Sequence, residues 1–210
     1  MVDQELPVDM SRQYRKDPPM SDMKTLDDLV EDFTWRFPRA RRDTVLLRCQ
    51  AAGSFKEAVW LATNSIDQRG KMHPHQVKVR KTSRDEFAKI ICSPGMRPET
   101  EGADSFNMLW QTLDEVKPWG IGELTVYDVA TRVGGYLELE PDMLYLHTGV
   151  RGGWLALVAR FSPARVGYWR GQSVVSPNVF PAPLLRLTVD EAEDFLCTYR
   201  DEFQGLENIQ

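Results

Sequence analysis

Three observations in the sequence predict an all-α fold, a multi-helix globular domain. Apolar side chains recur at helical spacing over residues 106–116 and again over 124–133. Capping boxes, in which a hydroxyl residue precedes an acidic residue by three positions, are expected to open helices at Ser83 and Thr188. The alternation that would indicate a β-strand occurs only over residues 77–80, which is too short to predict a strand.

The N-terminal half contains clear start and stop signals. Pro38 ends the first helix and Gly53 the second, while Ser54 is a good N-cap for the third, which is expected to bury Trp60. Residues 94–102 are expected to form a loop. In chain order, the helices expected in this half cover residues 24–36, 40–52, 55–66 and 83–91.

The C-terminal half is interrupted by glycine and proline. Asp104 or Ser105 is expected to cap its first helix, and the pair Gly134-Gly135 to end its second. Residues 162–183 are rich in glycine and proline. In chain order, the helices expected in this half cover residues 106–116, 123–133, 154–161 and 188–203.

Composition indicates an ordinary globular chain. The 210 residues carry a formal charge of −5 and no apolar run long enough to span a bilayer, so no membrane partner is predicted. Three widely spaced cysteines and no visible secretory signal favour the cytoplasm. We expect a disordered acidic tail over residues 1–22, one all-α domain over 23–204 and a flexible tail over 205–210.

Charge is unevenly distributed along the chain. Residues 1–34 hold nine acidic side chains, whereas residues 69–84 hold six lysines or arginines and no acid. Residues 143–189 also lack acidic side chains and contain five arginines. Such basic stretches either form a surface for a polyanion or are simply solvated faces.

The most specific motif in the chain is Gly120-Ile121-Gly122-Glu123-Leu124-Thr125. It stands between two apolar stripes, in a segment short enough for a tight hairpin. The glycines let the backbone approach a ligand closely, and Ile121 would fill the gap between the helices. The second helix would then present its free N–H groups and its positive dipole end at the hairpin, as an anion site.

This motif resembles the helix-hairpin-helix, a module that grips a nucleic-acid phosphate through the amides of its hairpin. In the module's pattern, Gly-apolar-Gly and two variable residues precede Thr-Ala; here Val126 replaces the alanine, and Glu123 adds a negative charge. A plain turn between two helices is the alternative. The resemblance implies these nucleic-acid-binding candidates: Gly120, Ile121, Gly122, Thr125, Lys117 and Arg151.

A helix-hairpin-helix in an all-α domain of this size is similar to the DNA glycosylase superfamily of that name. That superfamily has a catalytic aspartate after the hairpin, in a context like Val-Asp-Thr-His-Val. In the similar run 146–151 the aspartate is replaced by His147, which lies 25 residues past Gly122. Asp142 and Asp128 are the other catalytic candidates. The superfamily's lysine nucleophile is absent, because no lysine follows Lys117.

Three functions therefore stay open. The chain binds nucleic acid, expected to be DNA, through a glycosylase-like fold that has lost catalysis, with a role in DNA repair; or it is an N-glycosidase; or it is a protein-interaction module. No nucleotide-cofactor motif and no complete metal-ligand set is visible, so no cofactor is predicted. The candidates for a substrate pocket are His73, His75, Gln76, Tyr168, Trp169 and Arg170.

Overall fold

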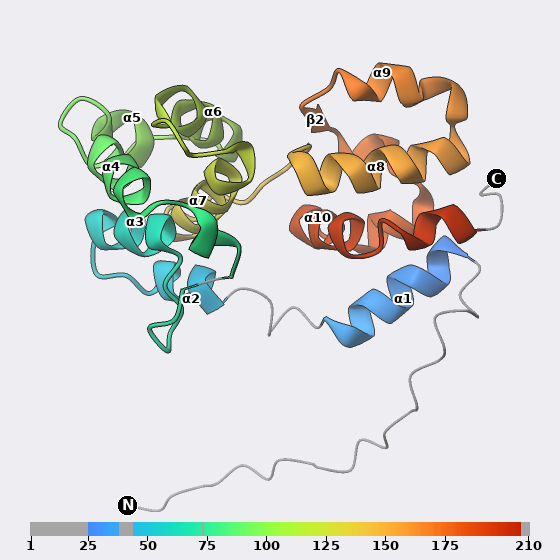
Figure 1. The fold of residues 1–210 in the computed structure, drawn as a ribbon, viewed down its shortest axis with the longest axis horizontal. Helices are drawn as coiled ribbons and strands as arrows, with labels where there is room; N and C mark the ends of the chain where they lie inside the picture. The colour runs from blue at the N-terminus through green and yellow to red at the C-terminus, as the bar shows by residue number, and fades with distance from the viewer. Residues whose placement is uncertain (1–24, 38–43, 73, 207–210) are drawn as a thin grey trace, which may run out of the picture.

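The computed structural model describes residues 25–37, 44–72 and 74–206, and this part of the chain is mostly helical, which confirms the all-α class (Figure 1). Its buried apolar side chains form two clusters. Residues between Val45 and Tyr145 form the central cluster, on the left of Figure 1. The terminal cluster, on the right, combines the first helix with residues from Leu144 to Leu206.

The predicted tails and the domain predicted between them are only partly covered by the described residues. The tail expected over residues 1–22 lies outside the described residues. At the other end, the described chain continues to Leu206, whose side chain is buried in the terminal cluster. That residues 23–204 behave as one domain stays a prediction, since the apolar core itself is divided.

The central cluster is built around helix α7, which packs against α2, α3 and α6. Side chains of Ser54 and Ser105 accept N–H groups at the starts of α3 and α6, so both predicted caps are confirmed. The elements of this cluster are α2 (Thr44–Gln50), α3 (Phe55–Asn64), the 3-10 turn η3 (Pro74–Lys78), α4 (Lys81–Ile91), α5 (Arg97–Glu101), α6 (Phe106–Val116) and α7 (Glu123–Tyr136).

Gly134 and Gly135 do not end α7, contrary to the prediction, because the helix continues to Tyr136. A Cβ on Gly134 would lie 2.8 Å from the carbonyl oxygen of Leu139, and one on Gly135 would lie 2.3 Å from Leu46 Cδ1. These glycines therefore serve close packing inside a continuous helix. Sequence spacing alone cannot separate that use of glycine from a helix stop.

Three local predictions for the N-terminal half of the chain were also wrong. The chain is already helical at Lys81, so Ser83 is a buried residue within α4 and caps nothing. Residues 97–101 form α5 in place of the expected loop. Trp60 is 50% exposed, because neighbouring Ala58, Val59, Leu61 and Ala62 occupy the buried face of α3.

The terminal cluster is centred on the fully buried Trp154, whose ring meets Trp169 edge-on at 5.4 Å. Helix α8 starts six residues before the predicted position, and the capping box at Thr188 is confirmed at the start of α10. α10 ends at Thr198, before the predicted residue 203. The elements are α1 (Leu26–Arg36), α8 (Thr148–Phe161), η4 (Pro163–Arg165), α9 (Val166–Arg170), η5 (Pro177–Val179), η6 (Ala182–Arg186), α10 (Val189–Thr198) and η7 (Glu202–Gly205).

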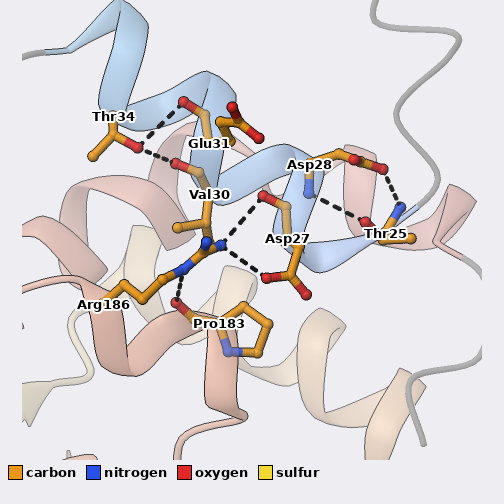
Figure 2. A network of polar contacts seen from close by, with 8 residues as sticks. All are labelled: Thr25, Asp27, Asp28, Val30, Glu31, Thr34, Pro183 and Arg186. Carbon is orange, nitrogen blue, oxygen red and sulfur yellow. Dashed lines mark hydrogen bonds and ion pairs between the residues drawn. The ribbon is translucent and has the colours of Figure 1, made fainter.

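Helix α1 joins this cluster from the opposite end of the sequence. Figure 2 shows Arg186 from η6 reaching the first turn of α1, where its guanidinium lies 3.0 Å from the Asp27 carboxylate. The same guanidinium donates to the carbonyl oxygen of Pro183, 3.4 Å away, which holds it in place. Deeper in the cluster, the Tyr199 hydroxyl donates to the buried carboxylate of Asp32. Apolar packing and polar contacts thus both fix α1 to the C-terminal residues.

A short extended segment connects the two clusters. Strand β1 (Leu144–Tyr145) pairs antiparallel with β2 (Val174–Val175). Side chains alternate along extended chain, and here Leu144 and Leu146 enter the terminal cluster while Tyr145 enters the central one. Residue 147 follows directly, at the junction of the two clusters.

Candidate nucleic-acid interface

The predicted helices and the tight connection between them are present at residues 106–136. The amide of Ile121 donates to the carbonyl oxygen of Pro118 at 3.2 Å, which closes a four-residue turn. Gly120, the third residue of this turn, has φ +88°, as position i+2 of a type II turn requires. Ile121 is 6% exposed and belongs to the central cluster, so it fills the space between the helices as expected.

The N-terminus of α7 has no side-chain cap. Gly122 occupies the N-cap position with an extended backbone (φ −93°, ψ 170°), and it has no side chain that could accept the first amides of the helix. A Cβ built on Gly122 would meet nothing within 4 Å. The space beside Gly122 is therefore open and no side chain caps the first turn of α7, in contrast to the serine-capped α3 and α6.

A second helix start lies next to the hairpin. A Cβ on Gly120 would approach the Ser83 hydroxyl to 3.0 Å, so the hairpin rests on the first turn of α4. The N-cap of α4, Arg80, makes no side-chain cap hydrogen bond, and its guanidinium lies 5.6 Å from the ring centroid of Trp119. Two uncapped helix N-termini and one exposed arginine thus meet here, an arrangement that favours an anion.

The other predicted nucleic-acid contacts have structural partners. Lys117 forms an ion pair with Asp114 one turn earlier, and Thr125 is buried in the first turn of α7. Arg151 lies on α8, where it donates to the carbonyl oxygen of Gln172 at 2.7 Å. The structure therefore gathers the glycines, Ile121 and Lys117 at the hairpin and places Arg151 in the terminal part of the molecule.

Most arginines of the acid-free stretch 143–189 hold the fold together. Arg160 donates to the carbonyl oxygen of Leu206, as Arg151 does to Gln172, and Arg186 pairs with Asp27. Arg165 and Arg170 are the exposed arginines of η4 and α9. The basic composition of this segment is thus largely explained by internal carbonyl and carboxylate partners.

His147 is the candidate catalytic residue with the most distinctive environment. It is 4% exposed at the N-cap of α8, its Nε2 lies 2.7 Å from Glu193 Oε1 on α10, and its ring centroid lies 5.3 Å from that of Tyr127. In the neutral tautomer whose Nε2 donates to the carboxylate, Nδ1 carries a lone pair; Nδ1 has no hydrogen-bond partner among the described residues. His147 and Glu193 together therefore have the composition of a histidine base that a carboxylate holds in one orientation.

Tyr127 completes this buried group. Burial, followed by the nearby Glu193 and Asp190 carboxylates, raises its pKa well above the ordinary tyrosine value. Tyr127 therefore stays neutral at physiological pH. Sequence reasoning missed Glu193, although it lies three residues before the inward-facing Leu196 and so borders the buried face of α10.

The two other catalytic candidates are placed elsewhere. Asp142 is exposed in the connection between α7 and β1. Asp128 accepts a hydrogen bond from Gln76 Nε2 at 3.0 Å and lies 3.8 Å from Arg132, which itself donates to Ser65 Oγ at 2.6 Å. Asp128 is thus part of a structural network that fastens η3 and α3 to α7.

The residues predicted for a substrate pocket do not form one group among the described contacts. His73 and the side chain of His75 lie outside the described residues. Gln76 is buried against Asp128 in the central half. In the terminal half, Trp169 is buried on Trp154, while Tyr168 is 62% exposed and Arg170 is exposed.

The described residues contain no group of three or more His, Cys, Asp or Glu side chains arranged to hold a metal ion. In the same ranges, no helix is both long enough and apolar enough to cross a bilayer.

The chain has no match among protein-family models, curated proteins or solved structures. Its relationship to the helix-hairpin-helix glycosylases therefore rests on the residues of the hairpin and stays a prediction. The geometry of the hairpin is the basis for a functional proposal.

Proposed function

We propose that the chain binds nucleic acid, with the hairpin between α6 and α7 holding a backbone phosphate. The observation that carries the proposal is the open start of α7, where Gly122 offers no cap and has free space in front of it. Helix N-termini bind phosphate through their amides and their dipole. Because the hairpin resembles the helix-hairpin-helix module, we expect the nucleic acid to be DNA.

The charges around the hairpin support a site that holds few phosphates. Lys81 and Lys117 are neutralised by Asp85 and Asp114, which leaves Arg80 and the helix ends as the main attraction for an anion. Exposed Glu123 in the first turn of α7 opposes it. We therefore expect moderate affinity and a shallow salt dependence, because each phosphate contact contributes about one unit to the slope of log K against log salt.

Replacement of Gly122 by serine tests the proposal without disturbing the fold. The backbone at Gly122 suits any residue, and a serine hydroxyl at the N-cap would accept the amides of the first turn. Gly122→Ser should keep or raise stability by a few tenths of a kcal/mol while it occupies the phosphate donors. Gly95→Ser is the matched control, since a Cβ there also meets nothing within 4 Å.

The measurement is fluorescence anisotropy of labelled DNA with the full chain at low and high salt, together with urea unfolding of each variant. We expect salt-sensitive binding by the native chain and the Gly95→Ser variant, and at least about tenfold weaker binding by Gly122→Ser, which is 1.4 kcal/mol. Native affinity in a folded Gly122→Ser variant contradicts the phosphate grip. Absence of DNA binding at low salt contradicts the function itself and leaves the protein-interaction alternative.

A second candidate function, N-glycosidic cleavage, is favoured by the pairing of His147 with Glu193. In the superfamily's motif a catalytic aspartate stands where this chain has His147, and the Glu193 carboxylate of α10 lies 2.7 Å from that imidazole. Release of base from DNA containing damaged nucleotides tests this candidate. Activity that disappears in Glu193→Gln with DNA binding intact would support it, and unchanged activity in that variant would contradict it.

A further inference from the structure

The hairpin carries an exposed tryptophan that the phosphate grip does not use. Trp119 is 81% exposed, whereas Trp154 and Trp169 are buried and Trp35 and Trp60 are about half exposed (56% and 50%). Large aromatic side chains usually bury most of their area. The turn itself keeps Trp119 out of the core, because the hydrogen bond from Ile121 to Pro118 turns Ile121 inward and leaves Trp119 at the outer corner.

Arg80 fixes a cation beside this ring. Its guanidinium carbon lies 5.6 Å from the ring centroid, within cation–π range. An exposed cation–π contact contributes about 0.5–1 kcal/mol, so it favours this position of the indole and adds positive charge near it. Because the ring is still largely exposed, it retains apolar surface for a flat ligand.

The ring also lies close to the proposed phosphate position. Trp119 and Gly122 are three residues apart, so their Cα atoms are at most about 11 Å apart. That span covers one to a few nucleotides of a nucleic-acid strand, which rise by about 3.4 Å per nucleotide in a duplex. A base near the held phosphate can therefore reach the indole.

We infer that Trp119, positioned by Arg80, stacks on an unpaired nucleobase beside the phosphate held at Gly122, so that the ligand is single-stranded or locally unpaired nucleic acid. This inference rests on the proposed function. A paired base within a duplex has both faces covered by its neighbours, whereas a single strand or a bulge offers a free face. Every base has a face on which an aromatic ring can stack, so the contact distinguishes unpaired from paired nucleic acid and does not distinguish one base from another.

The test compares three probes of the same sequence with the full chain: a single strand, a perfect duplex and a duplex with an unpaired bulge. We expect the native chain to prefer the single strand and the bulge. Trp119→Ala should weaken these two by about 5- to 150-fold, the range for loss of one aromatic–base stack, and leave duplex affinity unchanged. Trp119→Phe should retain part of the preference, and Trp35→Ala, which removes a half-exposed tryptophan from α1, should retain all of it.

A fluorescent adenine analogue placed in the bulge provides a second readout, since stacking on indole quenches it. We expect quenching by the native chain and much less by Trp119→Ala. Equal affinity for all three probes, or equal weakening of all three by Trp119→Ala, overturns the inference. If Gly122→Ser weakens binding while Trp119→Ala changes neither preference nor quenching, the phosphate grip stands and the stacking inference fails. If the native chain binds no probe, both fail.

Discussion

Replacement of Gly153 by alanine should separate α8 from α10, and the structure gives the size of the effect. A Cβ on Gly153 would lie 2.0 Å from the carbonyl oxygen of Leu196 and 2.7 Å from its carbonyl carbon. Ordinary contact begins at 3.4 Å, so the two backbones must move apart by about 1.4 Å. Both groups belong to rigid helices at the centre of the terminal cluster, so the clash cannot be relieved by a rotamer change.

Two opposing effects determine the result. Alanine gains up to about 1 kcal/mol over glycine inside a helix, while overpacking a core typically costs about 1–3 kcal/mol, and a clash with fixed backbone is expected at or above the upper end of that range. The variant should therefore lose about 2 kcal/mol or more of unfolding free energy. For a chain of this length that corresponds to a Tm lower by about 4–8 °C.

Gly152→Ala is the matched control in the same helix. Its Cβ would meet the Arg200 side chain at 3.1 Å, and the far end of that side chain can move aside. This variant should be as stable as the native chain or more stable by up to about 1 kcal/mol. Urea unfolding followed by circular dichroism measures both variants. A Gly153→Ala variant at least as stable as Gly152→Ala would refute the reasoning.

Two further predictions concern buried polar groups. Burial raises the pKa of Tyr127, Tyr145 and Tyr199, so the neutral phenols stabilise the fold. Their contribution to the unfolding free energy should be steady below about pH 10 and fall above it. Tyr127→Phe should make that fall shallower in urea unfolding at alkaline pH. Glu193→Ala leaves both ring nitrogens of His147 without a hydrogen-bond partner among the described residues, so it should lower the unfolding free energy by about 1–3 kcal/mol. Glu193→Gln keeps a hydrogen bond and should lower it less. Equal unfolding free energies of these two variants would show that the hydrogen bond contributes nothing.

Local signals in the sequence were enough to predict most helices. The caps at Ser54, Ser105 and Thr188 lie next to the helices they open, so their chemistry is visible in the sequence. The same local signal failed at Ser83, because the preceding residues were already helical and the side chain packs beside Gly120. The prediction that Gly134 ends its helix failed for a similar reason, because this glycine allows close packing against Phe106 and Leu139.

In the candidate site, too, the local features could be predicted and the long-range contacts could not. The hairpin could be predicted, because its turn, its inward isoleucine and its uncapped helix all lie within residues 118–125. The pairing of His147 with Glu193 could not, since 46 residues separate them and only the packing of α8 on α10 joins them. The division of the core was equally hidden, because no local pattern reports that α1 belongs with the C-terminal helices.

The attachment of α1 to the end of the chain has a consequence for folding order. The hydrogen bond between Tyr199 and Asp32 closes a separation of 167 residues. During synthesis every buried residue of the central cluster emerges before α8, so that cluster can begin to assemble before the C-terminal partners of α1 are made. Long-range contacts of this kind form late, because closing a long segment costs chain entropy that only the completed contacts offset. Helix α1, which is synthesised before every other described helix, is therefore expected to be among the last to dock, and it remains exposed to proteases and to other chains until α10 arrives.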